Sequence, residues 1–200
     1  MLQLIHHEAV VASALLRPVG RTMAIVWTGM KPGADFKRIP GATDALDYFS
    51  LLYAHLKGFR WLDFGPSRSD LRDGALRYKR KWGSEIIAGH FKQPLIYWTC
   101  HGRSEAAQEF LQRHAFVSKQ NGALKALFFL DSNDRTEAQL SEVEKLITPG
   151  ISDYWVVSLS PLSQALRSDL KHIHPNIRAI EAKSVADAMR IAASVRTTHQ

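Results

Sequence analysis

The segment from residue 61 to residue 83 begins Trp61-Leu62-Asp63-Phe64-Gly65-Pro66-Ser67-Arg68, passes through Gly74 and ends Leu76-Arg77-Tyr78-Lys79-Arg80-Lys81-Trp82-Gly83. Residues 59–64 are mostly apolar, which predicts a short, buried strand. The glycine after it predicts a turn, and a dense cationic cluster follows between two aromatic residues. This order places a compact group of cations directly after a buried strand.

Most of the excess charge of the chain lies in the same segment. The chain carries a formal charge of +7, and residues 57–92 contain nine Lys or Arg against four acids, whereas residues 119–200 contain ten against nine. Because the surplus is local, it predicts one binding site for an anionic partner. The alternative is a solvated basic face without a ligand.

The part of the chain before this segment predicts a hairpin and a helix. Two apolar runs, 10–16 and 22–27, flank a connection that contains Pro18 and Gly20, which is typical of a β-hairpin. A helix is expected from an N-cap at Thr43 to a stop at Gly58. Its buried face should carry the side chains at helical spacing, namely Ala45, Phe49, Leu52, Tyr53 and Leu56.

The part after this segment predicts alternating strands and helices. Strands are expected at 94–100, 126–130, 154–159 and 176–182, and helices are expected to start at Ser104, Thr136, Ser160 and Ser184. Strand–helix alternation favours parallel pairing with right-handed crossovers. We therefore expect one mixed-sheet unit over residues 1–102 and a small open parallel α/β unit with three strand–helix units over residues 103–200.

Residues 8–90 resemble the C-terminal part of a FemAB-like domain within the GNAT acyltransferase superfamily. The resemblance rests on the hairpin, the loop 30–41, the helix over 46–56, and the series Asp63-Phe64-Gly65, Ser67, Gly74, Tyr78-Lys79 and Trp82-Gly83. It implies a partial GNAT-like mixed sheet and transfer of an acyl or aminoacyl group to an amine. The donor would be an acyl-CoA or an aminoacyl-tRNA, although the glycine-rich pyrophosphate loop of coenzyme-A-binding relatives is not found.

The resemblance places Lys79 near the reacting groups. A preorganised cation there could stabilise developing negative charge, and Asp63 could act as a base or orient an amine. The alternatives are that residues 77–81 alternate along an exposed edge strand, and that Asp63 accepts hydrogen bonds from its own turn, which we favour. Gly65 and Gly83 should supply turn geometry.

The remaining cations and aromatic residues of the cluster predict an anion-binding surface. Arg68 and Arg72 could each hold a phosphate bidentately, although Asp70 and Asp73 could instead pair with them. The other members of the expected surface are Tyr78, Arg80 and Trp82, whose aromatic rings would also allow base stacking.

Other chemistries are not predicted. No acidic or cysteine partner lies at ligand spacing from His172 or His174, so no metal is expected. The single cysteine, Cys100, is expected to be a small buried hydrophobe. It suits a reducing compartment, and with no apolar run long enough to span a bilayer we expect a cytoplasmic protein.

Two classes of function remain open. The first is an acyl or aminoacyl transferase, possibly incomplete on its own. The second is a non-catalytic module that binds a phosphate-bearing ligand (a nucleotide, a cell-wall precursor or, less favoured, RNA) through residues 68–81, and an inactive remnant is a third possibility. Strands that a full GNAT-like domain carries before the hairpin are expected to be missing, so we predict uncovered apolar surface and a homodimer or a partner subunit.

Overall fold

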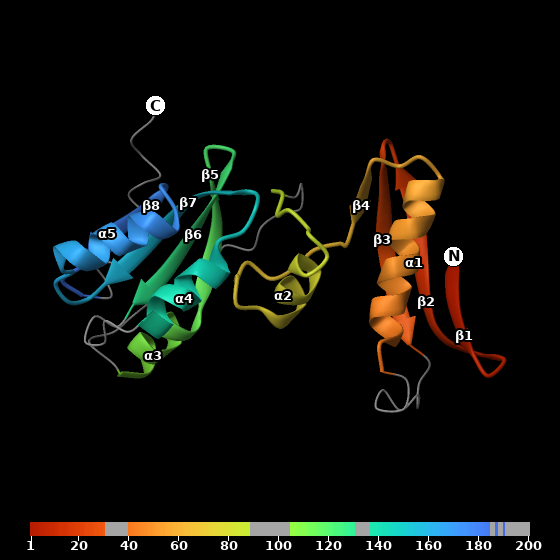
Figure 1. Cartoon of the computed structure of the whole chain (residues 1–200), viewed down its shortest axis with the longest axis horizontal. Coiled ribbons are helices and arrows are strands. Elements are labelled where there is room, and N and C mark those ends of the chain that lie inside the picture. The colour runs from red at the N-terminus through yellow and green to blue at the C-terminus, as the bar shows by residue number, and fades with distance from the viewer. Residues whose placement is uncertain (31–39, 89–104, 131–136, 185–186, 188–189, 191–200) are drawn as a thin grey trace. The chain divides into compact units, whose positions relative to one another are not determined.

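The computed structural model describes residues 1–30, 40–88, 105–130, 137–184, 187 and 190 (Figure 1). Within these residues the protein is mixed α/β, with two four-stranded sheets and five helices. The chain divides into two compact units, Met1–Pro66 and Ser67–Gln200. The division therefore falls after Pro66 and not near residue 102, which lies outside the described residues.

The first unit is a mixed sheet in the order β1-β2-β3-β4 with one helix on it. The predicted hairpin is confirmed, and a strand that the sequence did not predict, β1, precedes it and pairs antiparallel with β2. The fourth strand pairs parallel to β3 and is shorter and more exposed than expected. The bounds are β1 (Leu2–His6), β2 (Ala9–Val19), β3 (Thr22–Met30) and β4 (Trp61–Asp63).

The predicted helix is present as α1 (Ala42–Leu56), but two details of the prediction are wrong. Gly41 occupies the N-cap position in a left-handed conformation, and Thr43 makes no cap. The expected buried face also points outward, because α1 lies on β2 at Ala12 and Ala14, where small side chains allow close approach. The side chains that α1 buries are Ala42, Leu46, Asp47, Ser50 and Ala54.

The second unit contains a sheet in the order β5-β6-β7-β8 (Figure 1). Strands β6, β7 and β8 run parallel, as predicted, and β5 pairs antiparallel with β6. The hairpin between β5 and β6 turns at Asn121-Gly122, and both residues have positive φ. The bounds are β5 (Ala115–Gln120), β6 (Ala123–Leu130), β7 (Ile151–Ser158) and β8 (Ile177–Glu181).

Two apolar clusters cover the two faces of this sheet. The larger packs α4 (Glu137–Leu146) and α5 (Gln164–Ile173) on Phe128, Tyr154 and Val156. The smaller packs Leu111 of α3 (Glu105–Arg113) against Phe129 and Val157. The expected cap of α5 at Ser160 is wrong, because Ser163 is the N-cap residue and its side chain accepts the backbone N–H of Leu166.

The segment that carries the cationic cluster belongs to the second unit. Leu71 and Leu76, from the turn before α2 (Gly74–Arg80) and from α2 itself, are part of the larger cluster. The expected strand at 94–100, with Cys100, and most of the expected C-terminal helix after Ser184 lie outside the described residues. None of the described helices has the length and apolar character that crossing a bilayer requires.

Candidate functional site

The cationic residues 77–80 lie on a short helix and not on an edge strand. Asp73 is the N-cap residue of α2, and its carboxylate accepts the backbone N–H groups of Ala75 and Leu76, both at 3.1 Å. An Asp in this position favours a helix start. The structural alternative of an alternating exposed strand is therefore wrong, and the side chains of Tyr78, Lys79 and Arg80 project from a helix that packs on the second unit.

Arg80 closes the C-terminal end of α4. Its Nη2 donates to the backbone carbonyl oxygens of Lys145 and Ile147, both at 2.8 Å. The last carbonyls of a helix have no partner within the helix, so a cation there satisfies them and interacts favourably with the helix dipole. Burial lowers the pKa of Arg80 below its ordinary value. The contacts of Arg80 thus give this arginine a structural role that the sequence did not predict.

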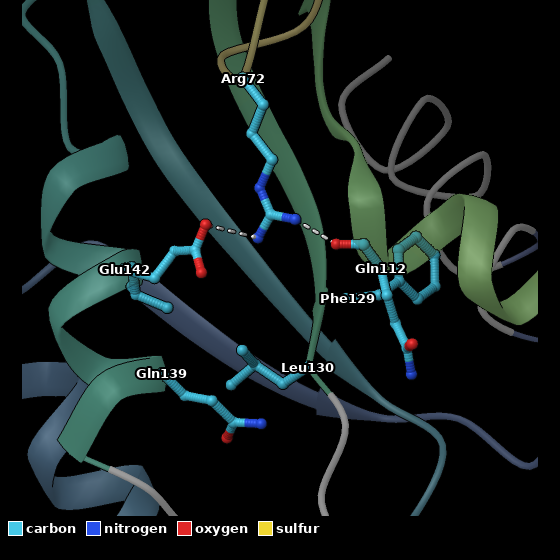
Figure 2. A pocket seen from close by; sticks show the side chains of 7 residues that line it. Arg72, Gln112, Phe129, Leu130, Gln139 and Glu142 are labelled. Carbon is cyan, nitrogen blue, oxygen red and sulfur yellow. Dashed lines mark hydrogen bonds and ion pairs between the residues drawn. The ribbon is translucent and has the colours of Figure 1, made fainter.

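Arg72 lies in a cavity of about 210 Å³ beside the carboxyl end of β6. In Figure 2 its side chain points between α4 and the end of α3. Phe129 and Leu130 provide the apolar part of the cavity lining. The carboxyl ends of parallel strands are the usual position of ligand sites in open α/β sheets. The lining residues are Arg72, Gln112, Phe129, Leu130, Gln139, Glu142 and Val143.

The guanidinium of Arg72 is held at one edge and lacks a hydrogen bond at the other. Nη1 donates to the backbone oxygen of Gln112. Nη2 lies 3.8 Å from the Glu142 carboxylate, which is longer than a hydrogen bond, and the buried Nε has no hydrogen-bond partner among the described residues. The Nε–Nη2 edge is the one that forks onto a carboxylate or phosphate.

A second polar cluster lies close to this cavity in the sequence. Asp70 is two residues before Arg72, and His114 is two residues after Gln112. The Nδ1 of His114 and Oδ2 of Asp70 are 2.5 Å apart, and Asp70 Oδ1 accepts the backbone N–H groups of Arg72 and Ala115. The ring of His114 stacks with that of Phe116 and contacts that of Phe110 in a tilted arrangement. A carboxylate at Nδ1 fixes the ring orientation and the tautomer, so that Nε2 of the neutral imidazole is the proton acceptor.

The other predicted site residues are distributed over both units. Asp63 is exposed at the end of β4 in the first unit, and its Oδ1 accepts the N–H of Gly65 at 2.7 Å, as favoured for an aspartate in its own turn. Arg68 is exposed, whereas Lys79, Tyr78 and Trp82 are half-buried in the second unit. Gly65 and Gly83 have φ of 76° and 72°, the left-handed conformation that their expected turn roles require.

Most of the residues that the structure brings together are not predicted by the sequence pattern. The pattern favours Asp70 only as a surface partner of an arginine, and it gives no local signal for Gln112, His114 or Glu142. The order of the elements does bring two of these segments together. If β5 and β6 form a hairpin, the start of β5 and the carboxyl end of β6 lie at the same end of the sheet.

Comparisons with known proteins do not identify this site. No family model, curated protein or solved structure matches the chain significantly. Within the part of the chain that the structure describes, no group of three or more His, Cys, Asp or Glu side chains could hold a metal ion.

Proposed function

We propose that the second unit binds the anionic head group, a phosphate or carboxylate, of a small ligand in the Arg72 cavity. The observation that carries this proposal is the Nε–Nη2 edge of Arg72 beside the carboxyl end of a parallel strand. Its buried Nε has no hydrogen-bond partner among the described residues, and its Nη2 is held only by the Glu142 carboxylate at 3.8 Å. A buried donor without a partner is uncommon in folded proteins, and an anion would satisfy it.

The size of the cavity limits the ligand. A volume of about 210 Å³ is below the range of roughly 300–1,000 Å³ that is usual for whole drug-sized ligands. The cavity therefore suits a head group, with the rest of a nucleotide or cell-wall precursor outside it. The cationic side chains of Arg68 and Lys79 belong to the same unit and favour such an anion at longer range.

Glu142 provides the matched variant for a test. An anion at Arg72 must displace the Glu142 carboxylate or share the guanidinium with it. Arg72→Gln should weaken binding of inorganic phosphate or a nucleoside monophosphate about 10- to 100-fold, the loss expected for hydrogen bonds to a charged group. Glu142→Gln should strengthen binding, because it removes a competing carboxylate.

Isothermal calorimetry at low and moderate salt measures the affinities of both variants. Lys79→Ala tests the contribution of the more distant cations, and a short RNA is measured as a further ligand. Phosphate contacts should weaken as salt rises. Equal affinity of the wild type and Arg72→Gln for phosphate would contradict the proposal. Tighter binding of RNA than of the nucleoside monophosphate would indicate that the ligand is a nucleic acid.

A second candidate function is acyl or aminoacyl transfer to an amine, the activity that the sequence resemblance implies. The observation that favours it is the Asp70–His114 pair, because an acceptor amine must lose a proton and an oriented imidazole can take it. The proposed roles of Lys79 and Asp63 belong to this candidate, and the two residues lie in different units.

Release of free thiol from an acyl-CoA in the presence of simple amines, and deacylation of an aminoacyl-tRNA, would measure this activity. His114→Gln should lower the rate about 10²- to 10⁴-fold, the contribution of a positioned general base. His172→Gln is the control, because His172 lies on α5 and is exposed. No turnover of either donor would contradict this candidate without affecting the binding proposal.

For the protein partner we propose a second copy of this chain, because large apolar side chains of the first unit are exposed on both its helix and its sheet.

A further inference from the structure

Helix α1 carries apolar side chains on two sides, although the side on the sheet also buries Asp47 and Ser50. One side packs on the sheet through small residues, and the other side exposes an aromatic and aliphatic stripe. The stripe consists of Tyr48, Phe49, Leu52, Tyr53 and Leu56, with exposed fractions of 54, 48, 38, 37 and 73%. Each of these residues has another member of the stripe three or four positions away, so they adjoin on the helix surface. A contiguous apolar stripe left exposed on a helix is typical of a protein–protein contact.

We propose that this stripe and the neighbouring strand β1 form the contact between two copies of the chain. This rests on the proposed homodimer and assigns its surface. Strand β1 is at the edge of its sheet, and no described strand pairs with its outer side. Its sequence, Leu2-Gln3-Leu4-Ile5-His6, contains no Lys or Pro and no inward charge to block edge pairing.

The strand is self-complementary in the antiparallel direction. Pairing centred on Leu4 places Leu2 opposite His6 of the second copy, and Gln3 opposite Ile5. Each residue then meets one from the same face of the other copy's strand, because side chains alternate along a strand. A two-fold axis at Leu4 therefore joins the two sheets into one, which is the isologous arrangement of most dimers.

The position of α1 fits this arrangement. Among the strands, α1 makes most of its contacts with β2 and β1, so it lies over the edge half of the sheet. With strands about 4.8 Å apart, the two α1 helices would be about two strand spacings, roughly 10 Å, from each other. Packed helices have axes about 8–10 Å apart, so the two stripes can meet as the edges pair.

The area is of the size that a dimer requires. From the exposed fractions, the stripe presents roughly 500 Å² in each copy, given the usual size of such side chains. Two stripes therefore bury roughly 1,000 Å², and the β1 edge, with Met1 and Ile5 exposed at 77 and 61%, adds to it. Stable interfaces bury about 1,200–2,000 Å² in total.

Sedimentation equilibrium of the full chain tests the proposal. We expect a dimer whose dissociation constant rises about 100-fold or more in Phe49→Glu, which places like charges near the axis, and in Ile5→Lys, which protects the edge. The control is Trp27→Glu. Trp27 pairs with Leu15 on the sheet face away from α1, is 57% exposed, and should change the constant less than about 3-fold.

The possible results test the homodimer and its proposed contact surface separately. A wild-type monomer at high concentration would overturn both the homodimer and this surface. A dimer weakened by Trp27→Glu but not by Phe49→Glu would overturn the surface alone. If Phe49→Glu does not fold, hydrogen exchange of the wild type decides, because protection of β1 amides must then rise with protein concentration; concentration-independent protection would overturn the proposal.

Discussion

The two units of this protein differ in how completely they bury their apolar side chains. The second unit has two apolar clusters, one on each face of its sheet, whereas the cluster of the first unit contains three buried residues, Ala12, Ala14 and Leu46. Among the described residues, thirteen of the fifteen exposed large apolar side chains belong to the first unit. The second unit thus has the larger apolar core, and the first unit leaves most of its large apolar side chains exposed.

The largest expected effect comes from the same substitution in each unit. Phe128→Ala removes a ring that is 1% exposed in the larger cluster and should cost about 3–5 kcal/mol. Phe49→Ala, at a site that is 48% exposed, should cost less than about 1 kcal/mol at concentrations where the chain is monomeric. Chemical denaturation of both variants measures the contrast. Equal losses would mean that the two units do not differ in burial.

A loss of stability of intermediate size is expected when the buried tyrosine of the second unit, Tyr154, loses its hydroxyl. The hydroxyl of buried Tyr154 donates to the carbonyl of Thr148 at 2.9 Å and accepts its N–H at 2.8 Å. Tyr154→Phe leaves both backbone groups unsatisfied and should cost about 1–3 kcal/mol. The exposed Tyr53 provides the control, and Tyr53→Phe should cost less than about 0.5 kcal/mol.

Burial raises the pKa of Tyr154 above its ordinary value of 10.0, and the Thr148 N–H opposes this shift. The neutral phenol is therefore the form that the folded state favours. Its contribution to stability is fully present below pH 10 and is lost as the pH rises through the raised pKa. Thermal melts from neutral to alkaline pH should show this loss in the wild type and not in Tyr154→Phe; parallel pH profiles would contradict the assignment.

The smallest effect is expected at acidic pH on the surface of the second unit. The backbone N–H of Leu162 and the Arg167 guanidinium lower the pKa of Glu181 below 4.5, with hydrogen bonds of 2.7 and 2.6 Å to Oε1. The stability from these contacts is present above pH 4.5 and is lost as the pH falls through the lowered pKa.

Glu181→Gln should therefore lower the melting temperature slightly at neutral pH and leave it unchanged in acid. Glu8→Gln, in the turn after β1, is the first-unit control and should have no effect at either pH. A loss in Glu181→Gln that persists unchanged in acid would contradict the role of the ionised carboxylate.

Periodicity predicted where the elements lie better than which side of them is buried. The strands at 126–130 and 154–159 are confirmed because their apolar runs leave few alternatives, and the strand at 176–182 is confirmed although it is more polar. For α1, the spacing predicts that the large apolar residues face the core, but the side that packs on Ala12 and Ala14 of the sheet is the one that carries Leu46. Strand β5 was missed although Asn121-Gly122 is a strong hairpin signal.

The candidate site was less predictable because its residues come from distant segments. The charge pattern pointed to Arg72 and Arg80 equally, and nothing local distinguishes an arginine that lines a cavity from one that caps a helix. That difference depends on α4, which lies some seventy residues further along. Likewise, Asp70 gains its imidazole partner only when residue 114 is brought to it.

The separation between these partners has a consequence for biosynthesis. Residues 69–71 bond to the backbone of β5, Arg80 to the end of α4, and Ile86 to Pro149. A ribosome adds roughly 5–20 residues per second, so Asp70 is made on the order of 2–9 s before His114. The most cationic part of the chain is thus synthesised seconds before its backbone and apolar partners, and it can pack only once the second sheet has been translated.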